Sequence, residues 1–184
     1  MRYLKQILSL VLVVVGMVLA TNTAKASHMS GGNIDFKCLG GDTFEITTRV
    51  FRYCRGAGFG GTTIRVTATS TCGNQVVATL DSVSGPLSRG SWDITDMCKT
   101  QKSNCQNGTT DGIEMYVFKG TVVGTPKCNY WSVYYRPPCC RPTVVNTNTS
   151  TPFLRTRINK AGGVGGDKAP TFDYEFLRPT PSAC

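Results

Sequence analysis

The sequence predicts an all-β protein, an antiparallel β-sandwich stapled by disulfides. Short segments alternate apolar with polar residues, clusters of Gly, Asn, Asp, Ser and Pro separate them, and no segment beyond residue 26 has a helical period. Nine cysteines lie between residues 38 and 184. Seven or eight short strands with turn signals between them are typical of a sandwich.

The first 26 residues have the organisation of a secretory signal peptide. Arg2 and Lys5 precede an uncharged apolar run at Ile7–Leu19, and Ala24-Lys25-Ala26 places small residues before a cleavage site. The run is too short for a transmembrane helix, which needs roughly 20 residues. We therefore expect an exported protein, extracellular or on the outer cell surface, with the periplasm as the other possibility.

Cleavage after residue 26 leaves 158 of the 184 residues, which is enough for one domain with its own core. We expect a signal peptide at 1–26, a β-sandwich module at 27–150, and C-terminal strands at 151–184 that complete the module or start a truncated second one. Cleavage lowers the net charge from +9 to +6. The remaining arginines are scattered singly, which favours solvated strand faces over a nucleic-acid site: Arg49, Arg52, Arg55, Arg65, Arg89, Arg136, Arg141, Arg155 and Arg157.

The strands are expected in a regular succession along the mature chain. Asn129–Tyr135 has large side chains at both parities, so we expect an inner strand with Trp131 in the core and its other face under a loop. The glycine-rich stretch 56–61 has neither the GK[ST] ending of a phosphate loop nor a following helix, so it is interpreted as a hairpin connection. The expected strands are Ile34–Cys38, Phe44–Val50, Thr62–Thr69, Gln75–Leu80, Ile113–Val123, Asn129–Tyr135, Phe153–Ile158 and Thr171–Leu177.

The cysteines are expected to form disulfides, because an exported chain meets an oxidising environment. Zinc ribbons and thioredoxin-like redox centres use CxxC pairs, and the sequence contains none. His28 is the one histidine, which leaves mixed Cys/His zinc sites poorly supplied. We expect no metal and no cofactor.

Two local pairings are proposed from spacing. Cys98 and Cys105 enclose six residues, a loop that a disulfide can close. Cys54 and Cys72 flank the glycine-rich stretch and the strand after it, and could tie the ends of that hairpin. Connectivity remains a hypothesis, because eight cysteines allow 105 pairings.

The adjacent Cys139 and Cys140 lie between prolines, which favour extended backbone in the preceding residue. Extended neighbours point to opposite faces, so we expect separate partners rather than a strained vicinal disulfide. Cys140 is expected to bond to Cys38, and Cys139 to Cys128 or Cys184. Because nine is odd, one cysteine stays free or bonds outside the chain, and Cys184 is the candidate.

A catalytic constellation is hard to assemble from this sequence. His28 lies at the mature N-terminus, so mechanisms that need a histidine base are poorly supported. The acids Asp93, Asp96 and Asp111 could serve a small hydrolase, a glycan-binding protein or a calcium site, although no DxDxDG loop is present. An exposed Trp92 beside Asp93 would favour glycan binding. We expect a protein that is not an enzyme.

The segment 27–56 resembles the opening module of large Bacteroidota cell-surface proteins, which usually end in a gliding-motility-associated, type IX secretion sorting domain. The likeness extends through about residue 145, including the cysteines, the run GIEMYVFKGTV and the CCR phrase. The chain departs from the family at Tyr53, where Asp is usual, and at Pro142, where Asn is usual. The matching residues are Ser27, His28, Gly31, Gly32, Cys38, Leu39, Gly40, Glu45, Ile46, Thr47, Arg52 and Cys54.

The resemblance implies an immunoglobulin- or cadherin-like extracellular module with a structural, adhesion or envelope-interaction role. No catalytic residues can be transferred from the family, and the partner, a protein or a polysaccharide, is unspecified. The chain ends at Cys184 without a sorting domain, so we expect a truncated reading frame or a short stand-alone relative. Asp81-Ser82-Val83 resembles the O-glycan acceptor of exported proteins in these bacteria, and an ordinary turn after a strand is the other interpretation.

Overall fold

The computed structural model describes residues 3, 6, 29–56, 58–98, 100–124, 128, 130–137 and 153–159. Several predicted features lie outside this part of the chain: the expected signal peptide except residues 3 and 6, the adjacent cysteines Cys139 and Cys140, the terminal Cys184 and the strand expected at Thr171–Leu177. In the described residues, no helix has the length and apolar character needed to cross a membrane. The elements are β1 (Met29–Gly40), β2 (Thr43–Tyr53), β3 (Thr63–Ser70), β4 (Gln75–Val83), β5 (Trp92–Asp93), the 3-10 helix η1 (Asn104–Gln106), β6 (Ile113–Val123), β7 (Tyr130–Tyr135) and β8 (Leu154–Asn159).

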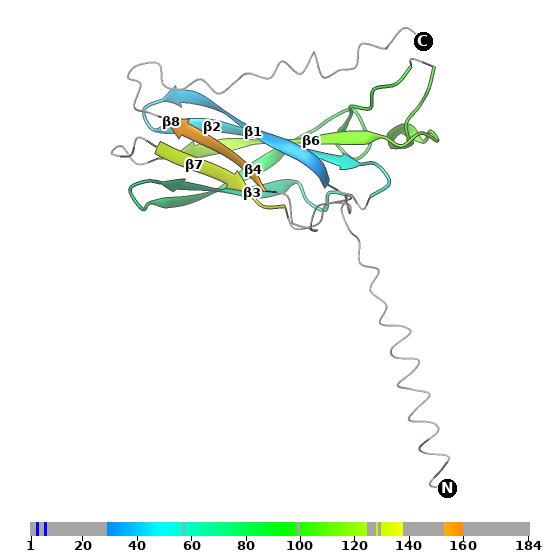
Figure 1. The fold of residues 1–184 in the computed structure, drawn as a ribbon, viewed down its shortest axis with the longest axis horizontal. Helices are drawn as coiled ribbons and strands as arrows, with labels where there is room; N and C mark the ends of the chain where they lie inside the picture. Colours follow the sequence, from blue (N-terminus) through cyan, green and yellow to red (C-terminus); the bar gives the residue numbers. More distant parts are fainter. Residues whose placement is uncertain are drawn as a thin grey trace, which may run out of the picture.

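The eight strands form one antiparallel sheet, in the order β1-β2-β6-β4-β3-β7-β8, with β5 also paired to β6 (Figure 1). The sheet folds over so that its two end strands, β1 and β8, come into contact. Gly32 lies at this contact, because a Cβ added there would lie 2.7 Å from Leu154 Cδ1 and would also meet the carbonyl oxygen of Arg49. The predicted all-β, antiparallel, disulfide-stapled sandwich is confirmed.

The core follows the alternation of each strand. In β2 the buried residues continue the predicted apolar parity, with Ile46 and Val50 fully buried. Trp131 of β7 is 2% exposed, which confirms it as a core residue. The outer side of β7 differs from the prediction, since Tyr130 is 49% exposed rather than covered by a loop.

The connection 56–61 is not a hairpin, which corrects the sequence interpretation. β2 and β3 are not neighbours in the sheet, so this segment crosses from one part of the sheet to another. Phe59 explains its path, because its ring lies 5.3 Å from the Tyr116 ring and 5.2 Å from the Phe118 ring, measured between centroids. The glycine-rich connection therefore carries one aromatic anchor that packs against β6.

Both pairings proposed from spacing are wrong. Cys105 bonds to Cys54, with Cα atoms 5.0 Å apart, and Cys72 bonds to Cys128, with Cα atoms 5.9 Å apart. The first bond ties the end of β2 to η1, and the second ties the β3–β4 turn to Cys128, two residues before β7. The expected bond from Cys139 to Cys128 is therefore also wrong. Distance along the sequence did not predict the partners, because each cysteine pairs with one from a distant segment that the sheet brings close to it.

Cys38 also differs from its predicted role. It is exposed and free, so the expected bond to Cys140 is not formed. The side chains of β1 beyond Phe36 face solvent, with Leu39 53% exposed, which leaves this end of the strand away from the core.

Candidate functional site

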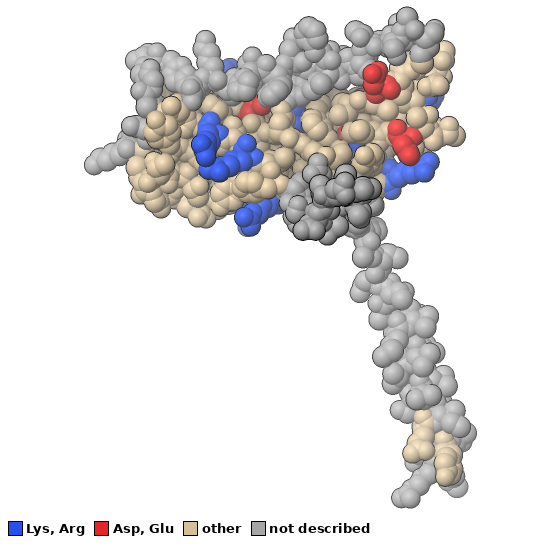
Figure 2. Space-filling view, in the orientation of Figure 1, with Lys and Arg blue, Asp and Glu red and all other residues tan. Residues whose placement is uncertain are grey.

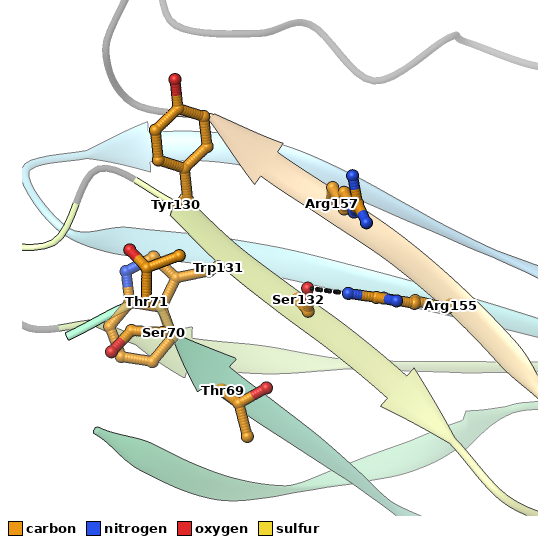
Figure 3. A pocket seen from close by; sticks show the side chains of 8 residues that line it. All are labelled: Thr69, Ser70, Thr71, Tyr130, Trp131, Ser132, Arg155 and Arg157. Atoms are coloured by element: carbon orange, nitrogen blue, oxygen red, sulfur yellow. Dashed lines mark hydrogen bonds between the residues drawn. The ribbon is translucent and has the colours of Figure 1, made fainter. Parts of the chain in front are cut away.

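The outer side of β3, β7 and β8 has an open hollow of about 420 Å³, which we call the basic groove (Figure 3). Three separate chain segments contribute to it, one from each strand and the residues next to it. The lining residues are Thr69, Ser70, Thr71, Tyr130, Trp131, Ser132, Arg155 and Arg157.

Strand alternation and register assemble the groove. Arg155 and Arg157 are exposed on β8, whereas the apolar residues that flank them are buried. Arg157 lies opposite Ser132 of β7, and Ser132 lies opposite Thr69 of β3. This rung of the sheet therefore presents a cation and then two hydroxyl groups across the three strands.

The two arginines keep their charge available at the surface. Arg155 donates a hydrogen bond from Nη2 to Ser132 Oγ at 2.8 Å, which directs its guanidinium from β8 toward β7 (Figure 3). In the part of the chain that the structure describes, neither Arg155 nor Arg157 has a carboxylate within ion-pair distance. Figure 2 shows basic side chains gathered where Figure 1 places β7 and β8.

Aromatic side chains lie at both ends of the groove. Tyr130 is exposed at one end, with its ring projecting from β7 (Figure 3). Beyond the other end, the rings of Tyr134 and Phe153 lie 5.6 Å apart, and the guanidinium of Arg136 lies 5.4 Å from the Phe153 centroid. Phe153 is 49% exposed like Tyr130, but its ring already contacts Tyr134 and Arg136, so Tyr130 is the ring that lines the groove without such a contact among the described residues.

Two of the acids proposed as an alternative site, Asp93 and Asp111, form hydrogen bonds or an ion pair with nearby residues of their own loop and its neighbours. Asp93 accepts hydrogen bonds from the Thr95 amide at 3.0 Å, the Thr95 hydroxyl at 2.6 Å, Ser103 Oγ at 2.6 Å and Gln106 Nε2 at 2.8 Å. Burial tends to raise the pKa of the Asp93 carboxyl, but these hydrogen bonds outweigh it and hold the pKa below its ordinary value. Asp93 is therefore a structural anchor for the loop between β5 and β6.

The other members of that alternative are no better arranged. Asp111 forms an exposed ion pair with Arg55 at 3.1 Å and accepts a hydrogen bond from Asn104, while Asp96 is exposed. Trp92 is partly buried, and a Cβ added at Gly85 would lie 2.8 Å from its ring, so it is not the exposed platform that glycan binding at this loop requires. The described residues contain no group of three or more side chains placed to hold a metal ion.

A buried charge network between β2 and β6 was not predicted from the sequence. Arg52 and Glu114 are each 1% exposed, and Arg52 Nε lies 2.9 Å from Glu114 Oε1. Ser91 donates a hydrogen bond to Glu114 Oε2 at 2.5 Å, and Arg52 donates from Nη2 to the carbonyl of Gly56 at 2.6 Å. Burial lowers the pKa of Arg52, while the Glu114 carboxylate opposes this shift.

The position of Arg52 in its strand already indicates that the side chain is buried. It continues the inward parity of Ile46, Thr48 and Val50, so its interpretation as a solvated arginine is wrong. The groove arginines carried a similar signal, since two arginines separated by one residue in a strand must share a face.

Ser82 lies within β4, not in a turn after a strand, and it is exposed. Its amide donates to the Thr62 carbonyl at 2.7 Å, and its side chain borders a second hollow of about 310 Å³. The expected O-glycan on Ser82 stays a prediction.

The fold and site together define a disulfide-stapled antiparallel β-sandwich with a basic outer groove. No family model, curated protein or solved structure matches the chain. The groove offers two cations, a row of hydroxyl groups and the exposed ring of Tyr130.

Proposed function

We propose that this chain is an exported, non-enzymatic module that acts in surface structure, adhesion or interaction with the cell envelope. The basic groove carries the proposal, because its arginines and Tyr130 are exposed on strands that the fold holds rigidly. Binding residues on a packed sheet are already positioned, so binding a partner costs little conformational entropy.

Two further features support an exported role. The N-terminal residues have the pattern of a signal peptide, and two disulfides join segments far apart in the sequence. The resemblance to the opening module of Bacteroidota surface proteins points the same way. The alternative is a small secreted hydrolase or glycan-binding protein that uses the acids near Asp93, but Asp93 and Asp111 accept hydrogen bonds that hold the β5–β6 loop together.

The test uses the full chain, expressed with its own leader in a bacterial host. We expect the chain in the exported fraction, accessible to protease added outside the cells. The purified, oxidised protein should bind envelope preparations, and the variant Arg155→Gln/Arg157→Gln should lose that binding. Retention in the cytoplasm, or binding that ignores the groove variant, would overturn the proposal.

A further inference from the structure

We propose that the basic groove binds a linear acidic polysaccharide whose sugars carry carboxylates, with Arg155 and Arg157 on the carboxylates and Tyr130 against a sugar ring. This inference rests on the proposed function and names the class of partner. Its support comes from the charge of the two arginines, from the hydroxyl groups of the lining and from the exposed ring of Tyr130.

The number and the common orientation of the two arginines suit a ligand with several carboxylates. A guanidinium presents a planar set of donors that can hold a carboxylate with two parallel hydrogen bonds. Arg155 and Arg157 lie on the same side of β8, roughly 7 Å apart along the strand at about 3.4 Å per residue. A polymer that lies along β8 can therefore place successive acidic groups on successive arginines.

The hydroxyl groups of the lining suit a sugar polymer. Thr69, Thr71 and Ser132 offer hydroxyl groups that both donate and accept, matching sugar hydroxyls, and Ser132 already shares its oxygen with Arg155. The hollow is open to solvent, so a polymer chain can reach its lining.

Single-stranded nucleic acid is the competing polyanion. Its usual sites stack successive bases on several free aromatic faces. Phe153 is as exposed as Tyr130, at 49%, but its ring already contacts Tyr134 and the Arg136 guanidinium, whereas Tyr130 has no such ring contact among the described residues. One ring between arginines and hydroxyls fits a sugar acid better than a run of bases.

The experiment measures binding of the exported, disulfide-bonded full chain to immobilised polygalacturonate at about 0.15 M salt, where long-range attraction is screened. Methyl-esterified polygalacturonate is the matched ligand, because it has the same backbone without the carboxylate charge. We expect binding to the acid form and little binding to the ester. Arg155→Gln/Arg157→Gln should weaken binding about tenfold or more, because each arginine contributes charge-assisted hydrogen bonds.

Two further variants separate a built site from general charge attraction. Lys37→Gln/Lys119→Gln removes the same charge from exposed positions on β1 and β6, and should change binding by less than about twofold. Tyr130→Ala should weaken binding without changing the charge. Thermal unfolding of each variant, expected to match the parent chain, verifies that the fold is intact.

Several outcomes would overturn the inference. They are equal binding to the ester, equal loss in the lysine control, or tighter groove-dependent binding of a single-stranded oligonucleotide than of polygalacturonate. Groove-dependent binding to envelopes without binding to polygalacturonate rejects the inference and leaves the proposed function standing. A chain that is not exported rejects the proposed function, whatever it binds in solution.

Discussion

At the scale of single residues, Arg52 and Glu114 form the most consequential contact that the structure describes. Glu114→Gln keeps the size of the side chain and the acceptor for Ser91, but leaves the Arg52 charge buried without its counter-ion. Breaking one partner of a buried ion pair costs about 3–5 kcal/mol, so we expect a loss of that order in the free energy of unfolding. Urea denaturation of the oxidised protein measures it.

Two controls accompany this prediction. Arg52→Met/Glu114→Gln removes both charges and should be more stable than Glu114→Gln alone. Asp111→Asn breaks the exposed pair with Arg55 and should cost only about 0–1 kcal/mol for that pair, because solvent screens it. A loss below about 1 kcal/mol in Glu114→Gln would show that the buried pair does not hold β2 to β6 as described.

Asp93 predicts a specific pH dependence of stability. Its pKa is lowered in the folded protein, so ionised Asp93 stabilises the fold above its unfolded pKa of about 3.9, and that stabilisation is lost as the pH falls through the lower folded value. Asp93→Asn should cost roughly 1.5–3 kcal/mol at neutral pH, because it removes the charged acceptor of several hydrogen bonds. Denaturation curves from neutral to strongly acidic pH should show the gap between the two proteins narrowing below about pH 3.9. A gap that is constant throughout would contradict this assignment.

At the scale of elements, two adjacent glycines of β1 test how the sheet closes. Gly32→Ala places a methyl group against the Arg49 carbonyl of β2 and against Leu154 of β8, so β1 must shift away from both strands, at a cost of about 1–3 kcal/mol. Gly31→Ala is the control, because its nearest contact is Phe51 at an ordinary 3.8 Å. Thermal unfolding should show a lower midpoint for Gly32→Ala only. Equal effects of the two substitutions would contradict close contact at this edge.

The disulfides give a second prediction at this scale. The bond Cys72–Cys128 spans 56 residues, and the chain-entropy relation assigns about 4 kcal/mol to a loop of that length. Cys72→Ser/Cys128→Ser should lower the free energy of unfolding by about that amount. A non-reducing peptide map of the parent protein should link these two cysteines, and Cys54 to Cys105. A peptide that links Cys72 or Cys128 to Cys98 would show that the pairing is different.

Local pattern predicted the strands well, because a half-buried strand must alternate. The expected bounds of β6 match those observed, and Phe44–Val50 lies within β2. The two-residue β5 escaped notice because so short a strand has no measurable period. Pairing could not be deduced, because strand order and cysteine partners depend on contacts between distant segments, and Cys54 and Cys72 precede and follow a strand that is no neighbour of β2.

At the scale of the whole molecule, the same limit explains why the basic groove was not predicted. Its residues come from 69–71, 130–132 and 155–157, which become neighbours only when β7 pairs with both β3 and β8. In the sequence Arg155 and Arg157 are two scattered cations. In the folded chain they share a surface with Tyr130 and a row of hydroxyl groups.

The last prediction concerns processing of the whole chain. If residues 1–26 are a signal peptide, the exported protein begins at Ser27, and N-terminal sequencing should read Ser-His-Met-Ser-Gly-Gly. Cleavage sites of this kind need small residues just before the cut, so Ala26→Arg should block processing and leave the longer chain with the membrane or cytoplasmic fraction. Ser27→Ala, one position later, is the control and should be processed normally. An exported protein that still begins at Met1, or normal processing of Ala26→Arg, would contradict the assignment.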